Sequence, residues 1–325
     1  PRIEEKVGGG IPTYARAQVD ARALARLDKE FVDTMGRRIF DRVTADHLTA
    51  PDRERLEEVT KQAAEMGGYN VPAFHGTSRP FEDPIFRTKG TELGAHFSST
   101  PGVAALFVGG SPLHADALRM LHQRPNETEP PSLEEAVMRK SAGGGLYKVY
   151  LNLQRPLRLR DMVSWDYDNE DGRKTLYDEV NRAIGFPEES FEILVVEEAE
   201  RLNWDFWDKV DRQSRWRGMA NFTWQQAMHN VLNDLGHDGI VYLNRREVVA
   251  PGDLAIPRER HMAMMAVEEG RGAISDEEFL EQFPDATDSY IVFEASQAKS
   301  SDVIVRNEAG KIMLPSQRFK PSMAS

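Results

Sequence analysis

The segment VPAFHGTSRPFEDPIFRTKGTELGAHFSSTPGVAALF, residues 71–107, decides the fold of this chain. It opens with the apolar run Val71–Phe74, which ends in the tripeptide His75–Thr77, and a second compact run follows at Gly94–Ser99. Short runs rich in Val and Phe and bounded by Gly and Pro predict strands. A proline at the first helical position predicts a small-residue helix over Pro101–Phe107. We therefore expect a strand, a long loop, a second strand and a helix.

The end of the first strand carries residue types that suit a ligand. Gly76 has no side chain, so the backbone there is open to close approach, and His75 beside it can hydrogen-bond a ribose hydroxyl. A His-Gly-Thr sequence by itself more often marks only the end of a strand. A partner motif elsewhere in the chain is needed before it indicates a ligand site. That partner is the alternating strand predicted over Asp288–Glu294, which is followed by the polar run Ala295–Ser300.

Together these motifs resemble the ADP-ribosyltransferases of the diphtheria-toxin and poly-ADP-ribose-polymerase clan. In that clan the first strand ends His-Gly-Ser/Thr, the second reads Gly-x-Tyr-Phe, a further aromatic follows on the next helix, and a late strand begins with a glutamate before Tyr-Ile/Val-Val. Here Gly94–Phe97 takes the second position and Phe107 falls where the helix aromatic belongs. The runs Leu235–Val241 and Tyr290–Ser300 are most similar to the ADP-ribosyltransferase module of phage and mobile-element polyvalent proteins. The motifs cover a minor part of the chain.

The resemblance implies that NAD binds as a substrate and that transfer of its ADP-ribose passes through a state with oxocarbenium character. Such a site must hold the dinucleotide in a strained pose, stabilise the positive ring and position a nucleophile. It implies that the Gly76 backbone binds the nicotinamide carboxamide, that His75 holds the adenosine ribose, and that His96 or Phe107 stacks on nicotinamide. Phe97 is expected to point into the core, because neighbouring strand residues face opposite ways. The implied NAD-binding residues are His75, Gly76, Thr77, His96, Ser98 and Phe107.

The sequence departs from the family pattern at the glutamate that precedes Tyr-Ile/Val-Val, because that position is Ser289. A serine cannot supply negative charge. Asp288 is one residue away, but one step along a strand turns a side chain to the opposite face unless a bulge intervenes, and Glu294 has the wrong parity too. Gln297 could hydrogen-bond the ribose hydroxyls without charge. The candidate catalytic residues are Asp288, Ser289, His96 and Gln297, with Asp288 as the electrostatic stabiliser.

The composition excludes several classes of protein. The 325 residues carry a net charge of −12, which argues against non-specific binding to nucleic acid or anionic membranes; the cluster of Arg155, Arg158 and Arg160 is interpreted as a solvated face. The chain has no cysteine, so disulfides, zinc–thiolate sites and cysteine nucleophiles are excluded. No apolar run is long enough for a membrane helix. His229 and His237 lack a third ligand nearby, so no metal site is expected.

We expect an α+β protein whose ADP-ribosyltransferase-like domain, residues 69–315, has a split antiparallel sheet around an NAD cleft. An N-terminal helical region, residues 1–68, precedes this domain. Two helical insertions are predicted within it, at about 161–222 and 247–287. A polar tail, residues 316–325, follows.

Several local predictions are specific enough to check. Apolar spacing and flanking Pro and Gly predict N-terminal helices over 17–47 and 51–66. A helix over 224–235 is predicted with Thr223 as its N-cap. The insertion at 161–222 holds four of the five tryptophans. These tryptophans either pack a small helical core, which is the favoured interpretation, or form a surface that stacks on bases.

The resemblance implies a mono-ADP-ribosyltransferase, encoded by a phage or mobile element, that modifies a host macromolecule with ADP-ribose from NAD. The acceptor is expected to be a protein rather than a nucleic acid, and the place of action the bacterial host cytoplasm, reached by expression there or with a phage virion. Polymer elongation is not expected, because the family glutamate normally serves it. Two alternatives stay open, namely an NAD glycohydrolase, and a non-catalytic structural or host-interaction domain with a degenerate NAD fold. Binding of NAD separates the last from the other two.

Overall fold

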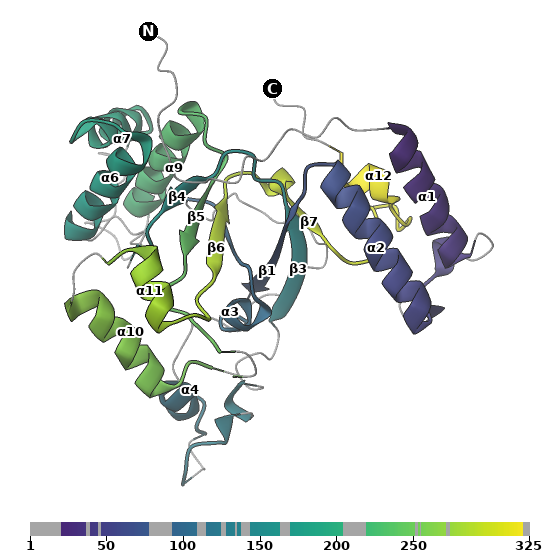
Figure 1. Cartoon of the computed structure of the whole chain (residues 1–325), viewed down its shortest axis with the longest axis horizontal. Coiled ribbons are helices and arrows are strands. Elements are labelled where there is room, and N and C mark those ends of the chain that lie inside the picture. The colour runs from purple at the N-terminus through teal and green to yellow at the C-terminus, as the bar shows by residue number, and fades with distance from the viewer. Residues whose placement is uncertain are drawn as a thin grey trace.

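Figure 1 shows the computed structural model of the chain, in which a central sheet lies between two groups of helices. The helices α1, α2 and α12 lie beyond one edge of the sheet, and α6, α7 and α9 lie at the other. The structure describes residues 21–36, 40–44, 47–77, 93–108, 115–124, 128–133, 135–137, 144–162, 170–203, 219–250, 253, 255–270 and 274–320.

The sheet has seven strands in the order β4-β5-β6-β2-β1-β3-β7. β4 and β5 are parallel, and every other neighbouring pair is antiparallel. A mostly antiparallel sheet combined with helices makes the chain an α+β protein, as predicted from the sequence. The strands are β1 (Val71–Thr77), β2 (Ala95–Ser98), β3 (Gly145–Leu151), β4 (Leu157–Leu159), β5 (Gly239–Leu243), β6 (Asp288–Val292) and β7 (Ala298–Ser300).

The junction between β1 and β2 is the weakest in the sheet. β1 pairs with β3 along its whole length, from Val71 to Thr77. Its register with β2 consists of one pair, Phe74 opposite Ser98. β2 then pairs fully with β6, from Ala95 to Ser98. The sheet is therefore made of two well-paired halves that meet at a single position.

The helices cover the sheet through separate hydrophobic cores. One core joins α6, α7 and α9 to Ile240, Tyr242 and Ile291 of the sheet, and another joins α1 and α2 to Tyr150. The helices are α1 (Ala21–Met35), α2 (Ala50–Met66), α3 (Pro101–Ala105), α4 (Ala115–Leu121), α6 (Glu170–Ile184), α7 (Ser190–Arg201), α9 (Met219–Asp234), α10 (Arg258–Gly270), α11 (Asp276–Gln282) and α12 (Pro315–Arg318), with 3-10 turns at Phe40–Arg42 and Ala295–Gln297.

The N-terminal helices differ from the prediction in one boundary. α1 ends at Met35, because Gly36 adopts a φ of 82°, a left-handed conformation that stops helices. The helix predicted to run to residue 47 is therefore too long. The second helix is confirmed, with Thr49 as an N-cap whose side chain accepts a hydrogen bond from the Asp52 amide. Its hydrophobic face packs against α1.

Of the predicted tail, residues 316–320 are described, and they do not form a polar tail. They form α12, and Phe319 is fully buried. The ring of Phe319 contacts the Tyr69 ring at 5.7 Å between centroids. The Ser316 amide donates to the Asp28 carboxylate at 3.0 Å. This last short helix therefore packs onto the N-terminal pair.

The predicted helix over 224–235 begins earlier than expected. α9 starts at Met219, so Thr223 lies inside the helix, where it is buried, and the N-cap prediction is wrong. Trp224 is buried and donates from Nε1 to the Tyr177 hydroxyl at 2.8 Å. The four tryptophans of the 161–222 insertion lie outside the described residues.

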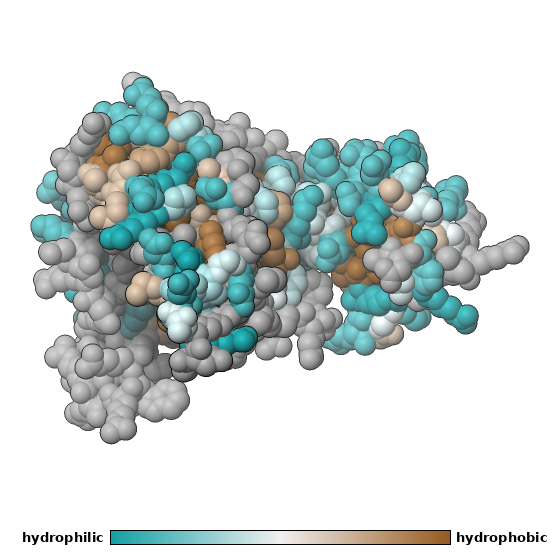
Figure 2. Space-filling model, turned by 90° about the horizontal axis from the view of Figure 1, so that it is seen from below, coloured by the Kyte–Doolittle hydropathy of each residue, from teal (hydrophilic) through white to brown (hydrophobic). Residues whose placement is uncertain are grey.

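The described surface is mainly polar. Figure 2 shows hydrophilic side chains over much of one face, with hydrophobic side chains in smaller groups between them. Within the described ranges, every helix is too short or too polar to span a bilayer.

Candidate functional site

The three motifs found in the sequence lie on neighbouring strands. β6 pairs with β2, and β2 pairs with β1, so the late strand, the second strand and the first strand stand side by side. One register row crosses all three, with Phe74 opposite Ser98 and Ser98 opposite Ser289. Two strand spacings separate β1 from β6, which is roughly 10 Å. Segments that are far apart in the chain thus form one region, here called the motif region: residues 74–77, 95–98 and 288–291.

His75 has a defined tautomer in the motif region. Its Nδ1 lies 2.7 Å from the His96 carbonyl oxygen, which can only accept, so Nδ1 carries the proton. Burial lowers the pKa of His75, and the hydrogen bond to His96 opposes that shift. The neutral ring therefore carries a lone pair on Nε2, which can accept a hydrogen bond from a hydroxyl group. The ring also lies against Phe97, with 5.2 Å between centroids.

The two aromatic positions of β2 point in opposite directions, as predicted. Phe97 is buried in the core, whereas the His96 side chain is solvent-exposed. Desolvation by the surrounding protein, together with the charge of the neighbouring His75, lowers the pKa of His96 to about 4. The ring is therefore neutral at pH 7. Phe107, just beyond α3, is 38% exposed, so both rings proposed to stack on nicotinamide are accessible.

The short helix α3 is packed closely onto β1 at Gly76. A Cβ atom on Gly76 would lie 1.8 Å from the Ala104 carbonyl oxygen, so only glycine fits here. The start of α3 is tied to β2, because the Thr100 amide donates to the Ser98 hydroxyl at 3.2 Å. Ser98 is buried, so its hydroxyl supports α3. Thr77 ends β1 opposite Gly145.

Asp288 is held by a cation. Its two carboxylate oxygens accept hydrogen bonds from Arg158, from Nη2 at 3.0 Å and from Nη1 at 3.2 Å. Arg158 also binds Asp276 at 3.0 Å, and Asp276 binds the buried Arg245 at 2.7 Å. This chain, here called the outer ion-pair chain, neutralises Asp288. Arg158 is exposed, in agreement with its interpretation as part of a solvated face, and its guanidinium also bridges two carboxylates.

Ser289 lies in a buried polar network, here called the inner network, with Tyr242, Asn244 and Glu247. The Asn244 amide nitrogen donates to the Ser289 hydroxyl at 3.2 Å. The Ser289 side chain also shares a hydrogen bond with Tyr242, which stands directly opposite it on β5. Burial raises the pKa of Tyr242, and the negative charges of Asp161 and Glu247 raise it further. Ser289 therefore contacts neutral groups. Of the two carboxylates that act on Tyr242, one also hydrogen-bonds Asn244.

That carboxylate belongs to Glu247, which follows β5. The side chain of Asn244 hydrogen-bonds the Glu247 carboxylate, and the Glu247 amide donates to Asn244 Oδ1 at 2.8 Å. Burial raises the pKa of Glu247, while Asn244 and Arg246 partly oppose the shift. The next residues contact α3, since Val249 lies 3.6 Å from a Cβ built on Gly102. Asn244 thus links a desolvated carboxylate to Ser289, the position where the resemblance expects a glutamate.

Gln297 is far from the start of β6 and its amide is fully used. Its Oε1 accepts from the Glu294 amide at 2.7 Å, and its Nε2 donates to the carbonyl oxygens of Asp238 and Asn152 at 2.6 and 3.2 Å. These bonds join the end of β6 to the ends of β3 and β5. Gln297 is therefore not brought together with Asp288, Ser289 and His96.

Sequence reasoning missed Glu247. It lies at the edge of a predicted insertion, and no motif marks it. The one available signal was the Asn244-x-x-Glu247 spacing, in which the asparagine side chain can bind the following backbone amides. The pairing of β5 with β6, which brings Glu247 to Ser289, is a long-range contact that local patterns do not encode.

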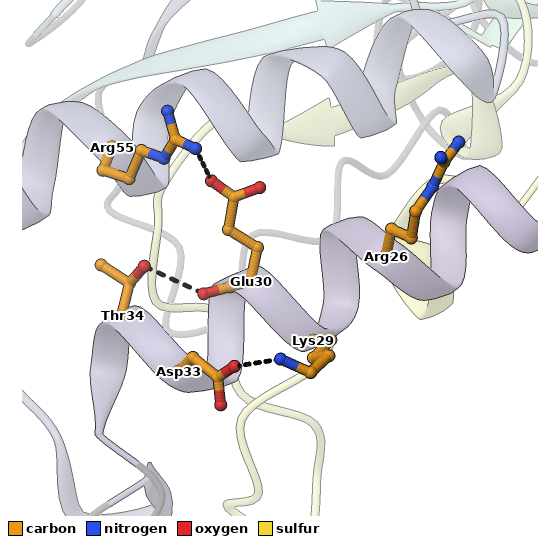
Figure 3. A pocket seen from close by; sticks show the side chains of 6 residues that line it. All are labelled: Arg26, Lys29, Glu30, Asp33, Thr34 and Arg55. Carbon is orange, nitrogen blue, oxygen red and sulfur yellow. Dashed lines mark hydrogen bonds and ion pairs between the residues drawn. The ribbon is translucent and has the colours of Figure 1, made fainter.

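Other parts of the described chain offer little chemistry. Within the described ranges there is no group of three residues able to hold a metal ion. A pocket of about 510 Å³ lies on α1 and α2. Figure 3 shows that Lys29 pairs with Asp33 and Arg55 with Glu30, and that Arg26 also lines the pocket. Thr34 donates to the Glu30 carbonyl oxygen at 2.9 Å. This pocket is thus an exposed groove between two ion-paired helices.

Known proteins give no guide to the identity of the chain. Protein families, curated proteins and solved structures were each compared with it, and none matches.

Proposed function

We propose that the chain is an NAD-dependent mono-ADP-ribosyltransferase. The observation that carries the proposal is the adjacency of β1, β2 and β6, the three strands with the motifs of that clan. Motifs that arise by chance have no reason to fall on neighbouring strands, least of all when some 190 residues separate β2 from β6. The reaction breaks the bond between nicotinamide and the ribose C1′ of NAD. It forms a bond from C1′ to an acceptor nucleophile, whose proton is released.

The proposed assignment for binding follows the geometry of β1 and β2. His75 holds the adenosine ribose through Nε2, because Nδ1 is committed to His96. The Gly76 backbone is proposed to bind the carboxamide, since Gly76 lies two residues beyond the one register pair between β1 and β2. His96 and Phe107, both exposed, provide the rings for nicotinamide.

The proposed electrostatic stabiliser is Glu247 rather than Asp288. Asp288 is paired directly with the Arg158 guanidinium. Glu247 is hydrogen-bonded by the neutral Asn244 side chain, and Arg246 acts on it only through its charge. A preorganised charge in a desolvated site stabilises a developing opposite charge more than one in water. The acceptor proposed is a host protein, and the setting proposed is a phage or mobile element in a bacterial cytoplasm.

A second candidate is a domain that binds NAD without turning it over. Ser289 in the place of the family glutamate favours it, because serine carries no charge. A third, the NAD glycohydrolase, differs only in using water as the acceptor.

One experiment separates these candidates. Purified chain is incubated with bacterial lysate and labelled NAD, and mass spectrometry follows the label, with His75→Ala as control. The proposal predicts a labelled macromolecule that disappears with His75→Ala. Free nicotinamide without a labelled macromolecule would indicate the glycohydrolase. Direct binding of NAD without either product would indicate the domain that binds NAD without turning it over. Absence of binding would reject all three and favour the structural or host-interaction domain with a degenerate NAD fold.

A further inference from the structure

A second pocket lies outside the motif region, on the edge strand β7. It has a volume of about 550 Å³, within the usual range of small-molecule sites. Its walls come from β7, from the turn around Asn307 and from α12. Figure 1 shows β7 and α12 at the side of the sheet that faces α1 and α2. Three separate segments therefore converge on one concave surface, here called the edge pocket.

The edge pocket is basic although the whole chain is acidic. Lys299, Arg306 and Arg318 line it, with Glu308 as the one carboxylate among the lining residues. The formal charge of the lining is thus +2, in a chain whose net charge is −12. A local excess of positive charge on an acidic protein attracts anions selectively to that place.

Arg318 is the strongest sign of a ligand. It is 5% exposed, and one of its amino groups, Nη2, donates to the Ser300 carbonyl oxygen at 2.5 Å. The other amino group, Nη1, is buried and has no hydrogen-bond partner. Burial lowers the pKa of Arg318 to about 10, and the charge of Asp302 opposes that shift. An orphaned donor on a buried cation costs free energy unless something outside the chain satisfies it.

Two further cations, Lys299 and Arg306, line the edge pocket together with Arg318. Arg306 donates to the carbonyl oxygens of Gly310 at 2.7 Å and Val43 at 2.8 Å, and these contacts orient its guanidinium. Burial lowers the pKa of Lys299. A bound anion would reverse that effect, because it favours the charged ammonium.

We propose that the edge pocket binds a small organic molecule that carries a phosphate group. A phosphate monoester has a charge of about −1.5 to −2 at pH 7 and three acceptor oxygens, which matches the charge of the lining and its three cations. Val305, Ala309 and Met313 form an apolar wall for the rest of the molecule. Asn307 and Gln317 provide amides for its polar groups. The site is independent of NAD turnover in the motif region.

Calorimetric titration of the full chain tests this site, with adenosine monophosphate and inorganic pyrophosphate as probes and uncharged adenosine as the control ligand. We expect saturable binding of adenosine monophosphate and none of adenosine. Lys299→Met should weaken binding by about tenfold or more, because a hydrogen-bonded charge is lost. Glu308→Gln should tighten it by removing the opposing charge. Lys311→Met is the matched control, since Lys311 is exposed and does not line the pocket.

Several results would overturn the proposal. These are no binding of adenosine monophosphate by the wild-type chain, equal binding of adenosine, binding of pyrophosphate alone, or an equal loss in Lys299→Met and Lys311→Met. Binding that is lost in His75→Ala but kept in Lys299→Met would place the ligand in the motif region and also overturn it. Arg318→Met should abolish binding, and its melting curve shows whether the fold survives. Because Lys299 is only half-buried, its variant keeps the test valid if Arg318→Met unfolds.

Discussion

Two carboxylates near the start of β6, those of Asp288 and Glu247, have contrasting electrostatic environments. Asp288, in the outer ion-pair chain, is held by both amino groups of Arg158 and is 34% exposed. Glu247, in the inner network, is held by the Asn244 amide, and its pKa is raised by burial. The first carboxylate has its charge cancelled by a cation. The second keeps a charge that is poorly solvated.

The difference matters for any reaction that develops positive charge. A carboxylate that is paired with a guanidinium exerts little net electric field on a substrate, because the two charges oppose each other. Water and salt screen what remains of that field. A desolvated carboxylate interacts more strongly with a nearby cation, because the effective dielectric constant is lower. Its position in the sequence next to Ser289 and Tyr290 suggests Asp288 as the carboxylate that stabilises the positive charge. The electrostatic environment favours Glu247 for that role.

The largest expected effect comes from Glu247→Gln. This change removes the charge but keeps the shape and the hydrogen bond to Asn244. We expect the rate of NAD turnover to fall on the order of 10²-fold, the usual cost of losing one preorganised electrostatic contact. NAD affinity should change little, because the charge acts on the transition state. Steady-state kinetics with a nicotinamide-release assay measures both.

The free energy of unfolding is the control for Glu247→Gln. It should stay the same or rise while the rate of turnover falls. A carboxylate whose pKa is raised on folding destabilises the folded state above that pKa, because the ionised form loses hydration. Glutamine has no such cost. The variant should therefore be at least as stable as the wild type in urea at pH 7. A clear loss of stability would mean that the fall in rate reflects damage to the fold.

The next largest effect is expected from His75→Ala, which tests whether the two carboxylates face an NAD site at all. The change removes Nε2, the proposed acceptor for the ribose hydroxyl, and the hydrogen bond to His96. Affinity for NAD should fall by about tenfold or more, to the point of no measurable binding in calorimetry. Unchanged affinity would reject the assignment of β1.

The pH dependence of turnover gives an intermediate effect. Because the pKa of Glu247 is raised above its ordinary value of 4.5, protonation removes its charge at a higher pH than in an ordinary glutamate. The rate should therefore decline on acidification before ordinary carboxylates titrate. This decline should be missing in Glu247→Gln and retained in Asp288→Asn. A wild-type profile that stays flat down to pH 4.5 would contradict the role of Glu247.

The smallest effect is expected from Asp288→Asn. The carboxylate sits in a partly exposed ion pair, which contributes about 0.2–1 kcal/mol. Thermal unfolding should detect that small loss. The rate of turnover should stay within about threefold of the wild type, which corresponds to a change of less than about 0.7 kcal/mol in the activation free energy. A hundredfold loss of turnover in Asp288→Asn would indicate that Asp288 is the catalytic carboxylate.

The sequence predicted the local elements well and the long-range contacts poorly. β1, β2 and α3 followed from apolar runs, Gly and Pro, and the opposite directions of His96 and Phe97 followed from strand alternation. Sequence could not show that Arg158 reaches Asp288 or that Asn244 links Glu247 to Ser289, because these contacts depend on which strands pair. It also missed α12, whose polar composition hides the burial of Arg318 and Phe319.

The most direct test of the account is a side-by-side measurement of nicotinamide release from NAD by the wild type, Glu247→Gln and Asp288→Asn. The account predicts that the wild type and Asp288→Asn release nicotinamide at similar rates, and that Glu247→Gln is slower on the order of 10²-fold. No release by the wild type, or a slow Asp288→Asn beside an unchanged Glu247→Gln, would contradict it.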